Sequence, residues 1–129
     1  MPIKSGKDDA GPYELYYWST IQGRGEFVRL ALEEAGADYI DVARLPARQG
    51  GGDAALMRFP GRQAIEHIPF APPFLKCGDL VIGQTANILQ FLGSRLGLAP
   101  RAAAGRIWAH QLQLTIADLV TEVHDTHHP

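Results

Sequence analysis

The spacing of apolar and polar residues predicts a chain that alternates strands and helices from its first ordered segment. Residues 15–18 form a short aromatic run with strand propensity, and the polar loop 19–23 ends it. Apolar residues recur at helical spacing over residues 26–35, and Gly36 can terminate that helix. A second strand-like run follows at residues 39–43. A strand, a helix and a strand this close together predict a parallel β-α-β crossover.

The middle of the chain predicts a short helix, a β-hairpin and another helix. Asp53 can cap a short helix over residues 53–59, after a loop with three consecutive glycines. Residues 74–76 and 80–82 flank a Gly-Asp turn, and this arrangement predicts a β-hairpin. Thr85 is a candidate N-cap for the helix that follows. The order β-α-β, short helix, β-β-α indicates an α/β fold.

The C-terminal part of the chain predicts one long amphipathic helix. Its apolar residues recur at helical spacing over residues 107–123, after a linker at residues 98–100. Such a stripe normally packs against partner helices, so we expect a sequence truncated within an all-helical second domain. The expected organisation is a flexible tail at residues 1–12, an α/β domain at residues 13–97, and the linker and first helix of a helical domain at residues 98–129.

Composition and charge narrow the classes of function. The 129 residues, 46% hydrophobic and 20% charged, are typical of one globular domain with an appendage. A net charge of -2 provides no long-range attraction for nucleic acid or anionic lipid, so neither is an expected partner. Cys77 is the single cysteine, which excludes an internal disulfide or CxxC pair and favours a cytoplasmic location. The apolar runs of the chain are too short to predict a secretory signal or a membrane span.

Two blocks of sequence resemble the glutathione transferase family. In residues 73–85, PFLKCGDLVIGQT, a proline, an apolar strand, a Gly-Asp turn, a second strand and a Gln-Thr pair follow at the family's spacing. Residues 16–29 are similar to the family's tyrosine-bearing first strand and the Gly-Arg opening of its first helix. The resemblance extends from about Tyr13 to the C-terminus. It implies a thioredoxin-like domain that binds glutathione, followed by a helical domain, and such motif matches need a structural test.

The resemblance implies where glutathione binds. Gln84 and Thr85 correspond to the pair that holds the γ-glutamyl carboxylate at a helix N-terminus, where free N–H groups attract anions. A plain helix cap is the competing interpretation of Thr85. Pro73 corresponds to the family's cis-proline, and the residue before it pairs its backbone with the cysteinyl part of glutathione. Here that residue is Pro72, which lacks an N–H. Losing one hydrogen bond of about 0.5 to 1.5 kcal/mol weakens binding by up to about tenfold.

Tyr17 is the candidate residue for activating the glutathione thiol. A hydroxyl that donates to the thiolate stabilises its charge and can lower the pKa of the thiol by about one to two units. The spacing from Tyr17 to Gly23 is one residue longer than in many relatives, so Tyr16, Ser19 and Thr20 stay alternatives. An aromatic residue at the end of a central strand is usually a core residue, and at least one of Tyr16 and Tyr17 is expected to be one.

Several other residues have weaker claims to a role. Asp118 resembles the aspartate that, in many family dimers, reaches the γ-glutamyl amine bound by the partner, and a solvated helix face is the equal alternative. Arg58 is the residue considered for anchoring the glycyl carboxylate. His124 and His128 would share a helix face, but a frayed terminus is favoured and no metal site is expected. Cys77 falls in the predicted hairpin turn, where no helix N-terminus lowers the pKa of its thiol.

The sequence therefore predicts a glutathione transferase-like protein of detoxification. Glutathione would be the co-substrate, no metal would be required, and a small hydrophobic electrophile would be the second substrate of a homodimeric enzyme. A non-enzymatic binding or dimerisation module with the same fold is the alternative, because Pro72 and the expected truncation weaken the case for turnover. A glutaredoxin-like oxidoreductase is disfavoured because the loop after the first strand contains no cysteine.

Overall fold

The computed structural model describes residues 12–59 and 65–128. The tail predicted at residues 1–12 lies, except for Pro12, outside the described residues. Four strands form a single sheet in the order β2-β1-β3-β4. The strands are β1 (Tyr13–Tyr16), β2 (Tyr39–Asp41), β3 (Phe74–Cys77) and β4 (Leu80–Gly83).

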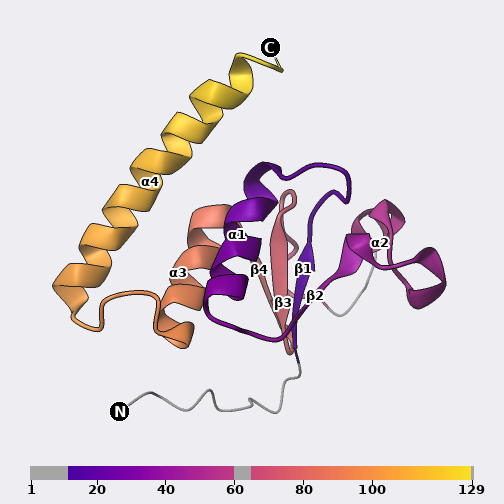
Figure 1. The fold of residues 1–129 in the computed structure, drawn as a ribbon, viewed down its shortest axis with the longest axis horizontal. Coiled ribbons are helices and arrows are strands. Elements are labelled where there is room, and N and C mark those ends of the chain that lie inside the picture. The colour runs from indigo at the N-terminus through magenta and orange to yellow at the C-terminus, as the bar shows by residue number, and fades with distance from the viewer. Residues whose placement is uncertain (1–11, 60–64, 129) are drawn as a thin grey trace.

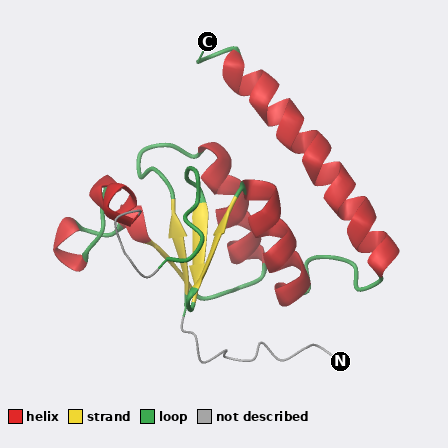
Figure 2. Cartoon of the chain, turned by 180° about the vertical axis from the view of Figure 1, so that it is seen from behind, coloured by secondary structure: helices red, strands yellow, loops and turns green. Residues whose placement is uncertain are grey.

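The sheet is mixed, as the predicted motifs require. Strand β1 pairs in parallel with β2, and it pairs antiparallel with β3 on its other side. Strands β3 and β4 form the antiparallel hairpin. The predicted β-α-β unit, the hairpin and the α/β fold class are thus confirmed, and Figure 2 shows the strands running side by side between the helices.

The helices lie on both faces of the sheet (Figure 1). On one face are α1 (Gly23–Glu34) and α3 (Thr85–Leu96), and on the other is the short α2 (Asp53–Arg58). The long helix α4 (Ala103–Asp125) runs beside α3, on the side away from the sheet. No described helix has the length and apolar character that crossing a membrane requires.

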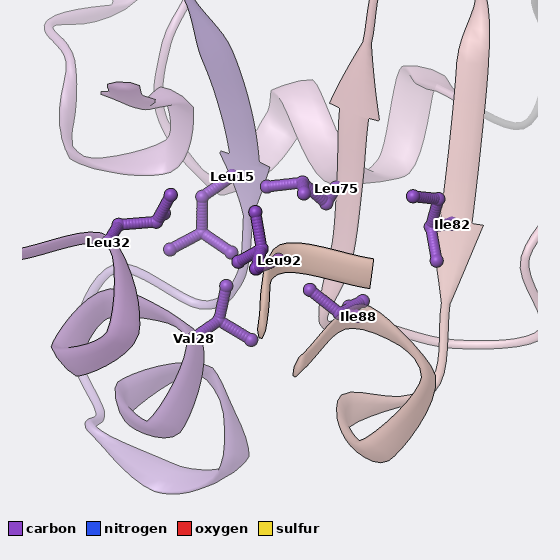
Figure 3. Close-up of a cluster of buried hydrophobic side chains, with 7 residues drawn as sticks. All are labelled: Leu15, Val28, Leu32, Leu75, Ile82, Ile88 and Leu92. Carbon is purple, nitrogen blue, oxygen red and sulfur yellow. The ribbon is translucent and has the colours of Figure 1, made fainter. Parts of the chain in front are cut away.

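Two clusters of buried side chains hold these layers together. The larger cluster fills the space between the sheet and helices α1 and α3 (Figure 3) and consists of Leu15, Val28, Leu32, Leu75, Ile82, Ile88 and Leu92. The second cluster lies on the α2 face, where Tyr16, Phe59 and Phe74 place their ring centroids 4.6–4.7 Å apart. Aromatic pairs at this separation stabilise beyond the area they bury.

A buried ion pair ties α1 to β2. The Arg29 side chain, 9% exposed, donates from Nε to Asp41 Oδ2 at 2.8 Å and also pairs with Glu26 one turn earlier. Burial by itself lowers the pKa of Arg29, but the two carboxylates outweigh burial and raise that pKa above its usual value. The orientation of α1 against the sheet is therefore secured by charge as well as by apolar packing.

Four sequence predictions need correction. Strand β1 covers residues 13–16 instead of 15–18, because its register is set by pairing with both neighbouring strands. Strand β2 ends at Asp41, where the chain turns into a 3₁₀ helix at Val42–Arg44. The N-cap of α2 is Gly52 instead of Asp53, and the N-cap of α3 is Gln84 instead of Thr85. Neither helix has a side-chain cap hydrogen bond.

Candidate functional site

The predicted site residues meet at one edge of the sheet. In the antiparallel pairing, Tyr16 lies opposite Phe74, and Phe74 lies opposite Gly83. These three residues form one row across β1, β3 and β4. The residue next to each of them in the same direction is Tyr17, Pro73 or Gln84. Three segments distant in sequence therefore leave the sheet at the same place.

Tyr17 is buried against the first turn of α1. Its side chain is 7% exposed, and its hydroxyl oxygen accepts a hydrogen bond from the backbone N–H of Arg24 at 3.2 Å. The first N–H groups of a helix have no partner within the helix, so the tyrosine hydroxyl satisfies one of them. The glycines on either side of Arg24 let the ring approach this turn closely.

The alternatives to Tyr17 have different surroundings. Tyr16 is 4% exposed within the aromatic cluster on the α2 face, and its hydroxyl donates to Glu14 Oε1 at 3.3 Å. Ser19 donates its backbone N–H to Asp53 Oδ1 at 2.9 Å, and Thr20 is exposed. Because side chains alternate along a strand, Tyr16 and Tyr17 point to opposite faces of the sheet.

Thr85, the first residue of α3, has an unpaired hydroxyl group. Thr85 Oγ1 is buried and has no hydrogen-bond partner among the described residues. The residue before it, Gln84, has a φ of 68° and is the one described non-glycine residue with a positive φ. This conformation lies in the sparsely allowed left-handed region. The capping role considered for Thr85 is therefore wrong, because Gln84 is the N-cap and the Thr85 hydroxyl caps no N–H group of the helix.

The segment before β3 carries the predicted proline pair. The Pro72–Pro73 peptide bond is cis, as the resemblance implies for Pro73. Pro73 is buried and Pro72 is half-buried. Since neither proline has an N–H, this segment presents carbonyl oxygens but no donors to anything that pairs with it.

A small cavity joins three helices next to these residues. It has a volume of about 50 Å³ and includes Arg24 and Phe27 of α1, Thr85 and Leu89 of α3, and Val120 of α4 among its lining residues. Arg24 thus connects Tyr17 to this cavity, because its backbone N–H contacts the Tyr17 hydroxyl and Arg24 lines the cavity together with Thr85. The Arg24 guanidinium also donates to Thr121 Oγ1 at 3.4 Å and so links α1 to α4.

A larger cavity of about 220 Å³ lies further along α3 and α4. Arg106, His110 and Gln113 contribute its polar wall. None of the predicted site residues lines it, so we assign the candidate site to the smaller cavity and the adjacent sheet edge.

The weaker candidates stand apart from this edge. Asp118 is exposed in the middle of α4 and lines neither cavity, although its neighbour Ala117 lines the smaller one. Arg58 is exposed at the end of α2. The ring centroids of His124, near the end of α4, and His128, beyond the helix, lie 4.9 Å apart, and the described residues include no group of three side chains that could hold a metal ion.

Comparisons with known proteins identify the group to which this chain is similar. No family model matches the sequence. A glutathione S-transferase of Plasmodium falciparum is 24% identical over 113 residues, which cover 87% of this chain and 51% of that protein. The crystal structure of the glutathione S-transferase from Ascaris lumbricoides superposes with a TM-score of 0.69 at 25% identity, over 91% of this chain and 51% of that one. The chain is similar to glutathione S-transferases in both sequence and fold.

A second solved member extends this likeness. The Nu-class glutathione S-transferase from Haemonchus contortus superposes with a TM-score of 0.62 at 26% identity, over 86% of this chain and 48% of that one. The chain therefore spans about half the length of the glutathione S-transferases that it matches. Its thioredoxin-like domain and the start of the helical part account for that half.

Within this glutathione S-transferase fold, sequence reasoning missed two contributors to the site. One is the backbone of Arg24, which nothing in a sequence pattern could assign as the partner of Tyr17. The other is Gly25, a glycine within a helix, where alanine is more favourable by about 1 kcal/mol. That glycine was an available signal, because an unfavourable residue inside an element often marks a close approach.

The single cysteine, Cys77, is poorly suited to act as a nucleophile. Burial raises the pKa of the Cys77 thiol, and the nearby Lys76 offsets this only in part. Since the thiolate is the reactive form, Cys77 is less nucleophilic at neutral pH than an exposed cysteine.

Proposed function

We propose that this chain binds glutathione at the sheet edge formed by Tyr17, Pro73 and Gln84. The observation that carries the proposal is Thr85 Oγ1, which is buried without a partner at the start of α3. Buried polar atoms almost always have a hydrogen-bond partner, so an unpaired hydroxyl beside free helix N–H groups indicates a missing anionic ligand. The γ-glutamyl carboxylate of glutathione has the charge and the geometry for this place.

The proline pair supports the same orientation of the peptide. An extended peptide that lies beside the segment before β3 would pair with it in the manner of an added strand. Pro72 can accept a hydrogen bond through its carbonyl oxygen but cannot donate one. We infer that glutathione binds here with one backbone hydrogen bond where two would be formed beside another residue.

The chemistry we propose is conjugation of glutathione to a small hydrophobic electrophile. The thiol gives up its proton to solvent, and the Tyr17 hydroxyl donates a hydrogen bond to the resulting thiolate. The sulfur then forms a bond to an electrophilic carbon while the leaving group departs with its electron pair. Holding thiolate and electrophile in one orientation contributes to the rate together with thiolate stabilisation.

We also propose that two copies of the chain associate through α4. Seven large apolar side chains of this helix are exposed, namely Ile107, Trp108, Leu112, Leu114, Ile116, Leu119 and Val123. A second copy could cover several of them, and burial of apolar surface stabilises at about 25 cal/mol per Å². In such a dimer Asp118 is our candidate for contacting the γ-glutamyl amine bound by the partner copy.

The domain organisation of the chain and its cellular compartment are part of the same proposal. We propose a glutathione-binding domain at residues 13–97 and a helical part that begins after it, because the 98–102 segment separates α3 from α4. A single cysteine with no possible partner in the chain supports a reducing, cytoplasmic compartment.

A non-enzymatic glutathione-binding or dimerisation module is the second candidate. One observation favours it: Pro72 lacks the donor for one backbone hydrogen bond. Binding of glutathione without turnover of an electrophile would identify this alternative.

Calorimetric titration with glutathione tests the proposal. Thr85→Val removes the hydroxyl at nearly constant shape, and we expect binding to weaken by about tenfold or more, the range of a charge-assisted hydrogen bond. Thr85→Ser should retain most of the affinity. Thr115→Val is the matched control, because its hydroxyl bonds only to Gln111 O of its own helix. Equal affinity of Thr85→Val and the parent would refute the proposed site, and conjugation of 1-chloro-2,4-dinitrobenzene by the same samples distinguishes enzyme from binding module.

A further inference from the structure

We propose that Gly23 and Gly25 are positioning residues for Tyr17, which they allow to pack against the first turn of α1 so that the Arg24 backbone N–H orients its hydroxyl. The inference rests on the proposed function, since it concerns how the thiol-activating hydroxyl is held. It assigns a role to two residues that would touch neither glutathione nor an electrophile.

The first argument is steric. A Cβ atom at Gly25 would lie 2.4 Å from both Cγ and Cδ1 of the Tyr17 ring, and a Cβ atom at Gly23 would lie 2.2 Å from the Tyr17 hydroxyl oxygen. Atoms do not approach this closely, so any other residue at either position displaces the ring. Gly23 also has a φ of 46°, which disfavours a side chain there independently.

Gly25 is the more informative of the two glycines. It is buried in the first turn of α1 and does not have a positive φ, so its backbone would accept alanine. Alanine is the more favourable residue within a helix. The Tyr17 ring is therefore the reason for glycine at this position.

The second argument concerns the direction of the hydroxyl proton. The Tyr17 oxygen accepts the Arg24 N–H at 3.2 Å, which occupies one of its lone pairs. The O–H bond is then directed away from Arg24, as donation to a bound thiolate would require. Accepting one hydrogen bond also strengthens the hydroxyl as a donor, because hydrogen bonds in a chain polarise one another.

These contacts predict that the position of the ring controls thiolate stabilisation. If a Cβ atom at residue 25 moves the ring, the hydroxyl loses the Arg24 N–H and its distance to the glutathione sulfur changes. The loss of thiolate stabilisation should be most of that caused by removal of the hydroxyl itself. Glutathione would still bind, because its carboxylate contacts are made at α3.

The test is a double-mutant cycle on the thiol pKa of bound glutathione, read from thiolate absorbance against pH. All proteins carry Cys77→Ser, so that the ligand thiol is the one observed. We expect Gly25→Ala to raise this pKa by about one unit, most of the rise produced by Tyr17→Phe. In the Tyr17→Phe protein, Gly25→Ala should give no further rise. Gly93→Ala is the matched control, a glycine in α3 whose Cβ would meet only Ala99.

The outcomes separate this inference from the proposed function. A parent-like thiol pKa in Gly25→Ala, together with a raised one in Tyr17→Phe, would overturn the positioning role and leave the function of Tyr17 intact. An unchanged pKa in Tyr17→Phe would instead refute the proposed activating role, and the positioning role with it.

A second measurement requires no glutathione, and it does not depend on whether the Gly25→Ala protein folds. Amide hydrogen exchange at Arg24 should be faster in Tyr17→Phe than in the parent, because the phenylalanine ring offers no acceptor. Exchange at Glu26, whose N–H donates to Gln22 O, serves as the internal control. Equal exchange rates at Arg24 in both proteins would show that the hydrogen bond does not hold Tyr17 and would overturn the inference.

Discussion

The carboxylate of Asp53 accepts a hydrogen bond from the backbone N–H of Ser19 at 2.9 Å. This contact joins the first turn of α2 to the loop that follows β1, across 34 residues of sequence. The loop leads directly from Tyr17 to α1, so Asp53, on the opposite face of the sheet, stabilises the loop next to the candidate site.

We expect Asp53→Ala to lower the free energy of unfolding by about 1.5 to 3 kcal/mol, the range for a hydrogen bond to a charged group. Asp53→Asn keeps an acceptor oxygen and should lose less. Urea denaturation measures both changes, and amide exchange at Ser19 locates them. Unaltered exchange at Ser19 in Asp53→Ala would contradict the assigned contact.

Tyr17→Phe should raise the thiol pKa of bound glutathione by about one to two units while the fold persists. The hydroxyl is lost but the buried ring is kept. Tyr16→Phe is the matched control, because its hydroxyl donates to Glu14 on the other face of the sheet. A shift of the titration curve in Tyr16→Phe but not in Tyr17→Phe would reverse the assignment.

Pro72→Val should strengthen glutathione binding by up to about tenfold, because it provides the backbone donor that proline lacks. Calorimetry on both proteins measures the effect. Ala71→Val is the control, since the exposed Ala71 already has an N–H and the side-chain change is comparable in size. Weaker or equal binding by Pro72→Val would mean that the ligand backbone does not pair at this residue.

The stability of the domain should fall at high pH through Tyr39. Burial and the hydrogen bond from its hydroxyl to Glu33 raise the pKa of Tyr39 from 10.0 to about 12. A raised pKa means that the folded state favours the neutral phenol, so this contribution is complete below pH 10 and disappears between pH 10 and about pH 12. Thermal unfolding over this range should show a smaller loss for Tyr39→Phe, and an identical loss in both proteins would exclude the linkage.

Self-association through α4 should depend on its exposed apolar residues. Trp108 is 57% exposed, and Leu112 follows one turn later with 44% exposed. We expect Trp108→Glu to shift the chain to monomer in sedimentation equilibrium, because a charge in the contact would have to be desolvated. Gln111→Glu introduces the same charge at an exposed polar position and should not. A parent chain that is monomeric at high micromolar concentration would refute the proposed association.

The order of elements could be predicted from the sequence because it depends on local periodicity. Helical spacing marks α1, α3 and α4, and the Gly-Asp turn between two short apolar runs marks the β3–β4 hairpin. The same local signals were less reliable at the ends of elements. Asp53 and Thr85 have the side chains of good caps, yet tertiary contacts gave one a distant partner and left the other unpaired.

The sequence by itself determined the α/β fold and the order of elements, since helical spacing and turn residues are local signals. The register that aligns Tyr16, Phe74 and Gly83 was decided by strand pairing in the tertiary structure. Only the tertiary structure decided which of two adjacent tyrosines faces α1. That choice depends on contacts of Tyr17 with Arg24 and Gly25 of α1, and on the contact of Tyr16 with Phe59 at the end of α2. Packing brings these residues together. Because the Tyr16 ring packs in the aromatic cluster on the α2 face, the next side chain, Tyr17, points to the opposite face.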